Sequence, residues 1–209
     1  SIRKLGIKVK LIKKDCIVYG KGLGGFKYKK NIILNAGNSG TTARLICALV
    51  INSNYHIKIT GDKSLKKRDM DRIIKPLSRF GAKFKSNNKK LPLKIIGPKK
   101  LIPITYNEKL GSAQCKSAVM IAALKTKGKT KIKCKPSRNH TELMFKKVLN
   151  IPIKIQKFKK FELIEIDGSN EYKNFNYNIP GDISSASFFI VLTLLSKNSF
   201  LTIKKVNIN

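Results

Sequence analysis

The chain has 209 residues, 42% of them hydrophobic, which is enough to bury the core of one domain or of one domain and part of another. Lysine and arginine number 45 against 11 acidic residues, a formal net charge of +34. No apolar run reaches the roughly 18 residues of a membrane span, and residues 1–6 lack the apolar core of a secretory signal. These features predict a soluble, cytoplasmic protein.

Such a charge ordinarily indicates nucleic-acid binding, because lysines neutralise phosphates. Here the basic residues are scattered through every segment among abundant isoleucine and asparagine, rather than gathered in one helix or tail. We therefore interpret the lysine excess as compositional bias and expect no nucleic-acid or membrane partner, with a basic RNA-binding module as the alternative. The positive field that remains favours small polyanionic ligands.

The four cysteines, Cys16, Cys47, Cys115 and Cys134, are widely spaced and contain no Cys-x-x-Cys pair. This spacing indicates neither a zinc knuckle nor a dithiol redox centre. We expect reduced and mostly buried thiols.

Three segments share one plan, a strand followed by a tight turn of small residues and a helix. They are residues 32–49, 110–124 and 179–192, and their turns recur about 70 residues apart. That spacing is typical of a repeated supersecondary unit rather than of a short solenoid repeat.

After each of the first two segments the same elements follow in the same order. A strand that alternates apolar and polar residues comes first, at residues 55–60 and 131–134. A polar loop with an arginine and an amphipathic helix come next, the helices lying near residues 70–80 and 141–149. Pro76 leaves the continuity of the first of these helices open, because proline removes a backbone donor.

Each unit is expected to close with paired strands, at residues 93–96 and 102–105 in the first unit, so that it reads βαβαββ. Repeated units of this kind predict an α/β fold whose helices pack inside, beneath sheets that face solvent. Residues 201–206 also read as a strand.

Residues 38–42, Asn-Ser-Gly-Thr-Thr, lie where the first strand passes into its helix. The free N–H groups and the positive dipole end of a helix start favour an anion, and Gly40 lets a ligand approach the backbone closely. The alternative is an ordinary Asn or Ser helix cap with a glycine turn.

Arg68 and Arg138 occupy matching places in the two units, each in a polar loop before the second helix. Arginine presents a planar fork of donors to a phosphate or a carboxylate, which lysine cannot do. The alternative for each is a solvated or ion-paired side chain, but their matching positions favour a binding role for both.

Ser112, Ala113 and Gln114 open the second helix with a hydroxyl, backbone donors and a carboxamide. This set suits a phosphate and a neighbouring carboxylate or hydroxyl, whereas helix capping is the alternative for Ser112. Asp182 follows Pro180 and Gly181 at the third helix start, where we expect its carboxylate to cap the helix.

Five motifs together resemble, in order and spacing, those of the 5-enolpyruvylshikimate-3-phosphate synthase family. They span residues 38–44, 61–68, 112–118, 137–142 and 180–186, so the resemblance covers nearly the whole chain. It implies a protein of two domains, each an inside-out α/β domain built from three βαβαββ units, with the active site between them.

The resemblance also implies the chemistry and the ligands. In this family the 5-hydroxyl of shikimate 3-phosphate attacks C2 of phosphoenolpyruvate while C3 is protonated, and the tetrahedral intermediate then loses phosphate. The phosphoenolpyruvate-binding residues would be Gly40, Arg68 and Gln114. The shikimate 3-phosphate-binding residues would be Ser112, Ala113, Gln114 and Arg138. No metal or organic cofactor is implied, and no catalytic residue is expected within this chain.

We expect the chain to be an internal fragment of a protein that is a monomer when complete. It begins with Ser1, and the family's N-terminal Lys-Ser-x-Ser-x-Arg motif and its C-terminal catalytic Asp, Lys and Glu have no counterpart here. Residues 1–178 would form most of one domain, and residues 179–209 would begin the second. A related transferase that acts on a UDP-linked amino sugar shares the fold but fits residues 112–114 and 137–141 less well.

Overall fold

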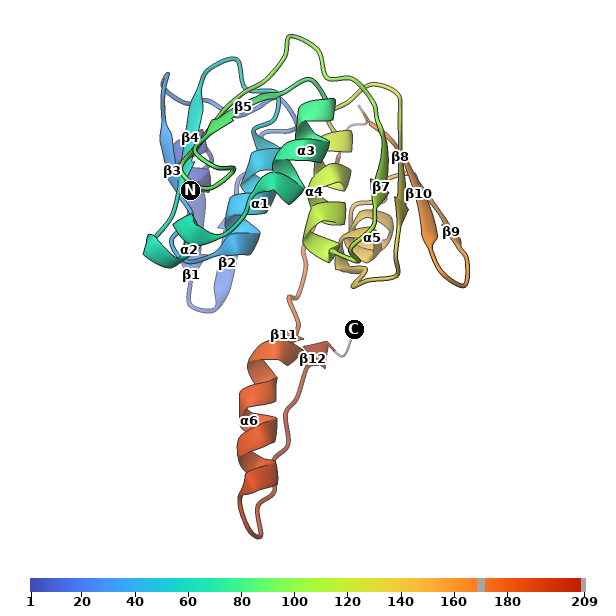
Figure 1. The fold of residues 1–209 in the computed structure, drawn as a ribbon. Coiled ribbons are helices and arrows are strands. Elements are labelled where there is room, and N and C mark those ends of the chain that lie inside the picture. The colour runs from blue at the N-terminus through green and yellow to red at the C-terminus, as the bar shows by residue number, and fades with distance from the viewer. Residues whose placement is uncertain (169–171, 208–209) are drawn as a thin grey trace.

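The computed structural model describes residues 1–168 and 172–207 (Figure 1). Residues 169–171 and 208–209, which belong to the two expected domains, lie outside the described part. The helical elements are η1 (Ile2–Leu5), α1 (Gly40–Leu49), α2 (Lys63–Lys67), α3 (Asp71–Arg79), α4 (Ala113–Ala123), α5 (His140–Leu143), the π-helical turn η2 (Met144–Val148) and α6 (Ile183–Leu195). The strands are β1 (Val9–Ile12), β2 (Asp15–Val18), β3 (Ile33–Asn35), β4 (Ile57–Thr60), β5 (Lys83–Ser86), β6 (Leu93–Ile96), β7 (Thr105–Glu108), β8 (Lys129–Cys134), β9 (Ile153–Lys157), β10 (Glu162–Asp167), β11 (Gly181–Asp182) and β12 (Val206–Asn207).

The two expected βαβαββ units are present and have the same topology. The first sheet has the strand order β3-β4-β6-β5 and the second has the order β7-β8-β10-β9. In each, the first two strands are parallel and the remaining pairings are antiparallel. The repeat found in the sequence is therefore a repeat of topology as well.

The closing strands of the first unit differ from the prediction. Residues 93–96 form β6, but the partner of β6 within the closing pair is β5, and residues 102–104 form no strand. Pro103 has no N–H for a sheet ladder, and Ile102 donates its N–H to the carbonyl oxygen of Phe80 at 3.1 Å. The strand at this place begins at Thr105 and opens the second unit as β7.

The helices of the two units also refine the prediction. Helix α3 runs to Arg79 without interruption at Pro76. The second unit places α5 and η2 where one helix was expected. The loop predicted after residue 60 contains the short helix α2, which begins where the Asp62 carboxylate accepts a hydrogen bond from the N–H of Leu65 at 2.7 Å.

The third repeat begins as expected, and its end differs from the prediction. Asp182 caps α6 by accepting hydrogen bonds from the N–H groups of Ser184 and Ser185 at 3.1 and 3.3 Å, which confirms its predicted role. The strand predicted at residues 201–206 is wrong for most of its length, because only β12 at Val206–Asn207 pairs, in parallel with β11.

The sheets lie outside and the helices lie between them, as the repeats predicted (Figure 1). Strand β8 buries Thr130, Ile132 and Cys134 and turns its lysines outward. Helix α4 packs against α1, α3 and the second sheet, and most of its residues are buried. The core is thus a layer of helices covered on its outer sides by lysine-bearing strands.

Helix α6 extends away from this core (Figure 1) and carries exposed apolar side chains such as Phe188, Phe189 and Leu195. Across residues 1–168 and 172–207, none of the helices combines the length and the apolar character needed to cross a bilayer.

The buried layer gives a first prediction. Phe80 at the end of α3 is fully buried, so Phe80→Ala should lower the free energy of unfolding by about 3–5 kcal/mol through lost contacts and a cavity. Phe158 is 48% exposed, and Phe158→Ala, the matched control, should cost about 1 kcal/mol, chiefly through its stacking on Phe161. Urea unfolding of the two variants tests this, and equal losses would contradict the assignment of the core.

Candidate active site

The starts of α1 and α4 lie side by side, on the side of the core from which the chain leads to α6 (Figure 1). Ser39 caps α1 by accepting from the N–H of Thr42 at 3.1 Å, and Ser112 caps α4 by accepting from the N–H of Cys115 at 3.3 Å. The capping role is therefore confirmed for both serines. Other first-turn N–H groups still lack an acceptor within the helix, so each start remains suited to an anion.

Gly40 and Arg68, two predicted site residues, lie together. A Cβ placed on Gly40 would be 3.1 Å from Nη1 of Arg44 and 3.2 Å from Nη1 of Arg68. The first residue of α1 therefore faces two guanidinium groups, one from its own helix and one from the end of α2. Glycine here leaves room for both arginines, which a methyl group would force to shift by a few tenths of an ångström.

Gln114, the third predicted site residue, joins this group through α1. Nη1 of Arg44 donates to Oε1 of Gln114 at 2.5 Å, and Nε2 of Gln114 donates to Oγ1 of Thr41 at 2.8 Å. Both polar ends of the carboxamide are thus held by a helix 70 residues earlier in the chain. The two hydrogen bonds fix the start of α4 against the start of α1.

Arg44 is a site residue that the sequence analysis did not single out, although it lies in one of the quoted motifs. The signal that could have found it is its place four residues after Gly40, which puts the two on the same side of a helix. Arginine is also scarce in this lysine-rich chain, with Arg44 one of only a few.

The charge of this region is positive and unbalanced. Within residues 1–168 and 172–207, none of the ion pairs involves Arg44 or Arg68, and the hydrogen-bond partner of Arg44 is the neutral Gln114. Arg68 is exposed and Arg44 is half-buried. Two neighbouring guanidinium groups without a carboxylate favour a bound anion, for which their planar donors are well shaped.

Three predicted site residues remain, two at the start of α4 and one in the loop before α5. Ser112 and Ala113 are partly exposed at the start of α4. Arg138 is exposed in the loop before α5, and its Nη2 donates to Oγ of Ser184 at 3.4 Å. The structure thus brings Gly40, Arg68 and Gln114 together around Arg44, whereas Arg138 contacts the start of α6.

A hollow of about 440 Å³ lies elsewhere, between α6 and residues 201–206. Its lining includes Ile190, Leu194 and Ile203, and Lys205 is the only charged residue among the described residues that line it. An apolar lining of this kind does not suit a phosphorylated ligand. The arginine-bearing helix starts remain the candidate site.

The thiols beside the site are those expected from the sequence. Cys47 on α1 and Cys115 on α4 are buried and free, as is Cys134, whereas Cys16 is exposed. Burial raises the pKa of the Cys47 thiol to about 12 and also raises the pKa of Cys115. These thiols are packing groups and do not supply a thiolate near neutral pH.

This difference in burial gives a second prediction. At pH 8 a thiol of pKa near 12 is ionised in roughly one molecule in ten thousand, so Cys47 of the folded chain should resist alkylation whereas Cys16 reacts readily. Iodoacetamide labelling followed by peptide mass spectrometry measures both sites, with the urea-unfolded chain as the control in which all four cysteines react. Rapid labelling of Cys47 in the folded chain would contradict the packing of α1.

Comparison with known proteins shows the family to which the chain belongs. The family model described as EPSP synthase (3-phosphoshikimate 1-carboxyvinyltransferase) matches residues 1–209. The chain is 42% identical over 213 residues to the 3-phosphoshikimate 1-carboxyvinyltransferase of Petrotoga mobilis, covering all of this chain and 48% of that protein. It is 40% identical to the protein of the same name from Ruthia magnifica, covering all of this chain and 47% of that protein.

A solved structure shows the same likeness. The EPSP synthase of Acinetobacter baumannii superposes with a TM-score of 0.81 at 32% identity, over 99% of this chain and 46% of that one. The chain therefore spans about half the length of the relatives it matches. Since the family match extends over every residue and the fold agrees, this chain belongs to the EPSP synthase family.

Proposed function

We propose that the complete protein, of which this chain supplies about half, transfers the enolpyruvyl group of phosphoenolpyruvate to the 5-hydroxyl of shikimate 3-phosphate and releases phosphate. The observation that carries the proposal is the group of Gly40, Arg44, Arg68 and Gln114 at two adjoining helix starts. An anion-binding site of this form suits two phosphorylated substrates, and the family of the chain supplies the reaction.

Phosphoenolpyruvate is proposed to lie against Gly40, Arg68 and Gln114. Arg68 offers a guanidinium that no carboxylate of the described residues neutralises, and the start of α1 adds backbone donors. Gln114 is held in place by Arg44 and Thr41, so its orientation does not have to be fixed when substrate binds.

Shikimate 3-phosphate is proposed to lie against Ser112, Ala113, Gln114 and Arg138. The start of α4 supplies a hydroxyl and backbone donors, and Arg138 supplies a fork of N–H groups for a phosphate. Gln114 would then touch both substrates, because it stands between the starts of the two helices.

In this proposal the chain's own residues bind and orient, and they stabilise the negative charge that develops on the reacting groups. The proton-transfer residues would lie in the other half of the protein. Residues 1–178 would form most of one domain and residues 179–209 the start of the second. The contact of Arg138 with Ser184 lies at this junction and supports a site between the two. We also propose a cytoplasmic monomer without a cofactor.

The alternative functions have less support. A transferase acting on a UDP-linked amino sugar would share the fold, but the relatives described above are 3-phosphoshikimate 1-carboxyvinyltransferases. A basic RNA-binding module would not explain a family match over the whole chain.

The proposed function is tested with the full-length protein from the complete coding sequence. Phosphate release should require both phosphoenolpyruvate and shikimate 3-phosphate, and mass spectrometry should detect the enolpyruvyl product. Replacing shikimate 3-phosphate by a UDP-linked amino sugar is the control. Turnover with the UDP-linked amino sugar, but not with shikimate 3-phosphate, would overturn the proposal.

A third prediction concerns Arg68. Loss of a charge-assisted contact to phosphoenolpyruvate should make Arg68→Ala raise the KM of phosphoenolpyruvate about tenfold or more. Because the side chain is exposed, stability should change by less than about 0.5 kcal/mol. Arg79→Ala is the matched control, since Arg79 is an exposed arginine in the last turn of α3. Equal phosphoenolpyruvate kinetics in Arg68→Ala and the parent, with the fold intact, would contradict the proposed contact of Arg68 with phosphoenolpyruvate.

A fourth prediction concerns Gly40 and glyphosate, a competitor of phosphoenolpyruvate that is slightly longer than the substrate. A methyl group on Gly40 meets Arg44 and Arg68, so it narrows the site beside both guanidinium groups. Gly40→Ala should therefore raise the inhibition constant of glyphosate by a larger factor than the KM of phosphoenolpyruvate. The parent enzyme should be glyphosate-sensitive, and an equal rise in both constants would show that Gly40 does not lie against the inhibitor.

A further inference from the structure

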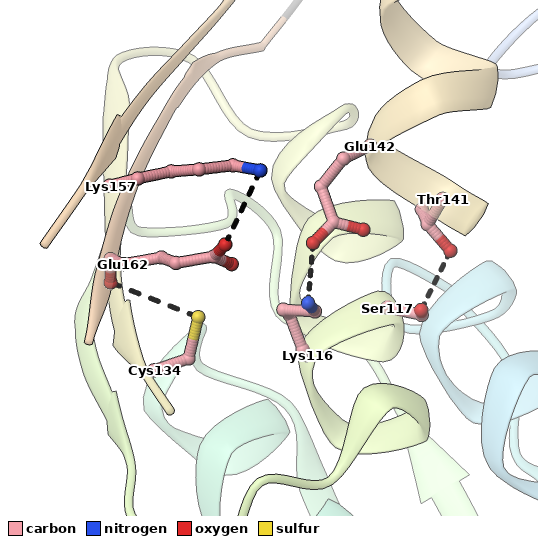
Figure 2. Close-up of polar contacts among 7 residues, drawn as sticks. All are labelled: Lys116, Ser117, Cys134, Thr141, Glu142, Lys157 and Glu162. Carbon is pink, nitrogen blue, oxygen red and sulfur yellow. Dashed lines mark hydrogen bonds and ion pairs between the residues drawn. The ribbon is translucent and has the colours of Figure 1, made fainter. Parts of the chain in front are cut away.

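Lys116 on α4 and Glu142 on α5 form an ion pair inside the core (Figure 2). Nζ of Lys116 lies 2.5 Å from Oε1 of Glu142, and the two side chains are 0% and 3% exposed. Lysine and glutamate are almost never buried so completely without a partner. Neither side chain can reach a substrate, so any role in binding is indirect.

A buried ion pair such as this one is by itself weak evidence of added stability. Replacing a buried ion pair by apolar residues of similar volume is often neutral or stabilising, because each charge gives up its hydration on burial. Here the two groups touch, yet among the described residues neither Nζ of Lys116 nor the carboxylate oxygens of Glu142 make a hydrogen bond of good geometry. A pair that is costly to bury and poorly satisfied points to a role in positioning.

The pair joins two parts of the candidate site. Lys116 lies four residues after Ser112, one turn into α4 and on the same side of the helix. Glu142 lies four residues after Arg138, in the first turn of α5. The ion pair therefore links the helix start that carries Ser112 to the helix that follows Arg138.

A second contact reinforces the link. Oγ of Ser117 and Oγ1 of Thr141, the neighbours of the paired residues, are 2.7 Å apart (Figure 2). Two adjacent side chains of α4 thus bind two adjacent side chains of α5. A double contact of this kind fixes both the distance between the helices and their relative rotation.

The second sheet packs against α4, the helix that carries Lys116. Glu108, Cys134 and Glu162 are buried and lie in direct register on β7, β8 and β10. Burial raises the pKa of Cys134 to about 11, and the Lys116 ammonium acts in the opposite direction. In the described part of the chain, no group of His, Cys, Asp and Glu is arranged to hold a metal ion. Lys116 is thus a buried cation on the inner side of a carboxylate-bearing sheet.

Arg138 is held from two sides by this arrangement. The loop that carries it ends in α5, which the ion pair ties to α4, and its guanidinium contacts Ser184 at the start of α6. We propose that the buried Lys116–Glu142 pair positions Arg138 relative to Ser112 and Gln114 and thereby sets the affinity for shikimate 3-phosphate. The inference rests on the proposed function, and Lys116 and Glu142 act in it as positioning residues.

The test uses the full-length enzyme and the double variant Lys116→Met/Glu142→Leu, which removes both charges together. The KM of shikimate 3-phosphate should rise about tenfold or more, because small misplacements of a binding group are costly. The KM of phosphoenolpyruvate should change less than about threefold, and the melting temperature should be unchanged or higher. The matched control is Lys129→Met/Glu165→Leu, an ion pair between β8 and β10 of the second sheet at 3.5 Å, with exposed fractions of 59% and 28%.

A double-mutant cycle separates positioning from a general loss of structure. Arg138→Ala should raise the KM of shikimate 3-phosphate strongly in the parent and much less in the Lys116→Met/Glu142→Leu background, because Arg138 is already misplaced there. Additive effects, or an unchanged KM of shikimate 3-phosphate in the folded double variant, would overturn the inference. So would equal changes in the variant and the control pair.

A second variant keeps the test decisive if the double variant does not fold. Thr141→Val removes the hydroxyl contact with Ser117 and should raise the KM of shikimate 3-phosphate about threefold, without a matching rise for phosphoenolpyruvate. An unchanged KM would contradict positioning by the α4–α5 contact. A parent enzyme inactive with both substrates would instead overturn the proposed function, whereas an active parent with unaffected variants would overturn only this inference.

Discussion

The packing of α4 against α1 is the interaction on which the rest of the site depends. Both helices bury small residues, such as Ala43 and Ala48 on α1 and Ala118 and Ala122 on α4. Small side chains let two helices approach closely, so their starts come level at one side of the core. Only in this register can Arg44 reach Gln114, because a slip of one helical turn, about 5.4 Å, would separate them. The polar contacts of the site therefore depend on the packing of α4 against α1.

Helix α4 is buried on nearly every side, so its charged residue Lys116 needs a partner, which α5 supplies. A helix in the middle of a core has no exposed face for a charged residue, so Lys116 must find its partner inside. Glu142 supplies that partner from the second helix of the same unit. The need to neutralise the buried charge of Lys116 therefore fixes α5 against α4. The position of α5 in turn sets the position of the loop that precedes it.

Local patterns predicted most of the fold. Short stretches of residues were enough to predict the three helix starts and the order βαβαββ. The same stretches contain the caps at Ser39, Ser112 and Asp182. The closing strands were misassigned, because an apolar run does not reveal its partner. Helix α2 was missed because its lysines resemble a solvated loop. Contacts between distant residues were out of reach as well: the Arg44–Gln114 bond spans 70 residues, and Lys116 is one lysine among many until the fold buries it.

The outward lysines of the sheets bear on how copies of this protein behave in a crowded solution. Strands β5 and β9 are edges of the two sheets, and edge strands with unpaired backbone groups invite pairing with another chain. Lys83 and Lys85 on β5, and Lys154 and Lys157 on β9, are exposed at these edges. Another copy approaching edge to edge would bring like charges together and strip them of water. The lysine-rich composition thereby opposes edge-to-edge pairing at β5 and β9.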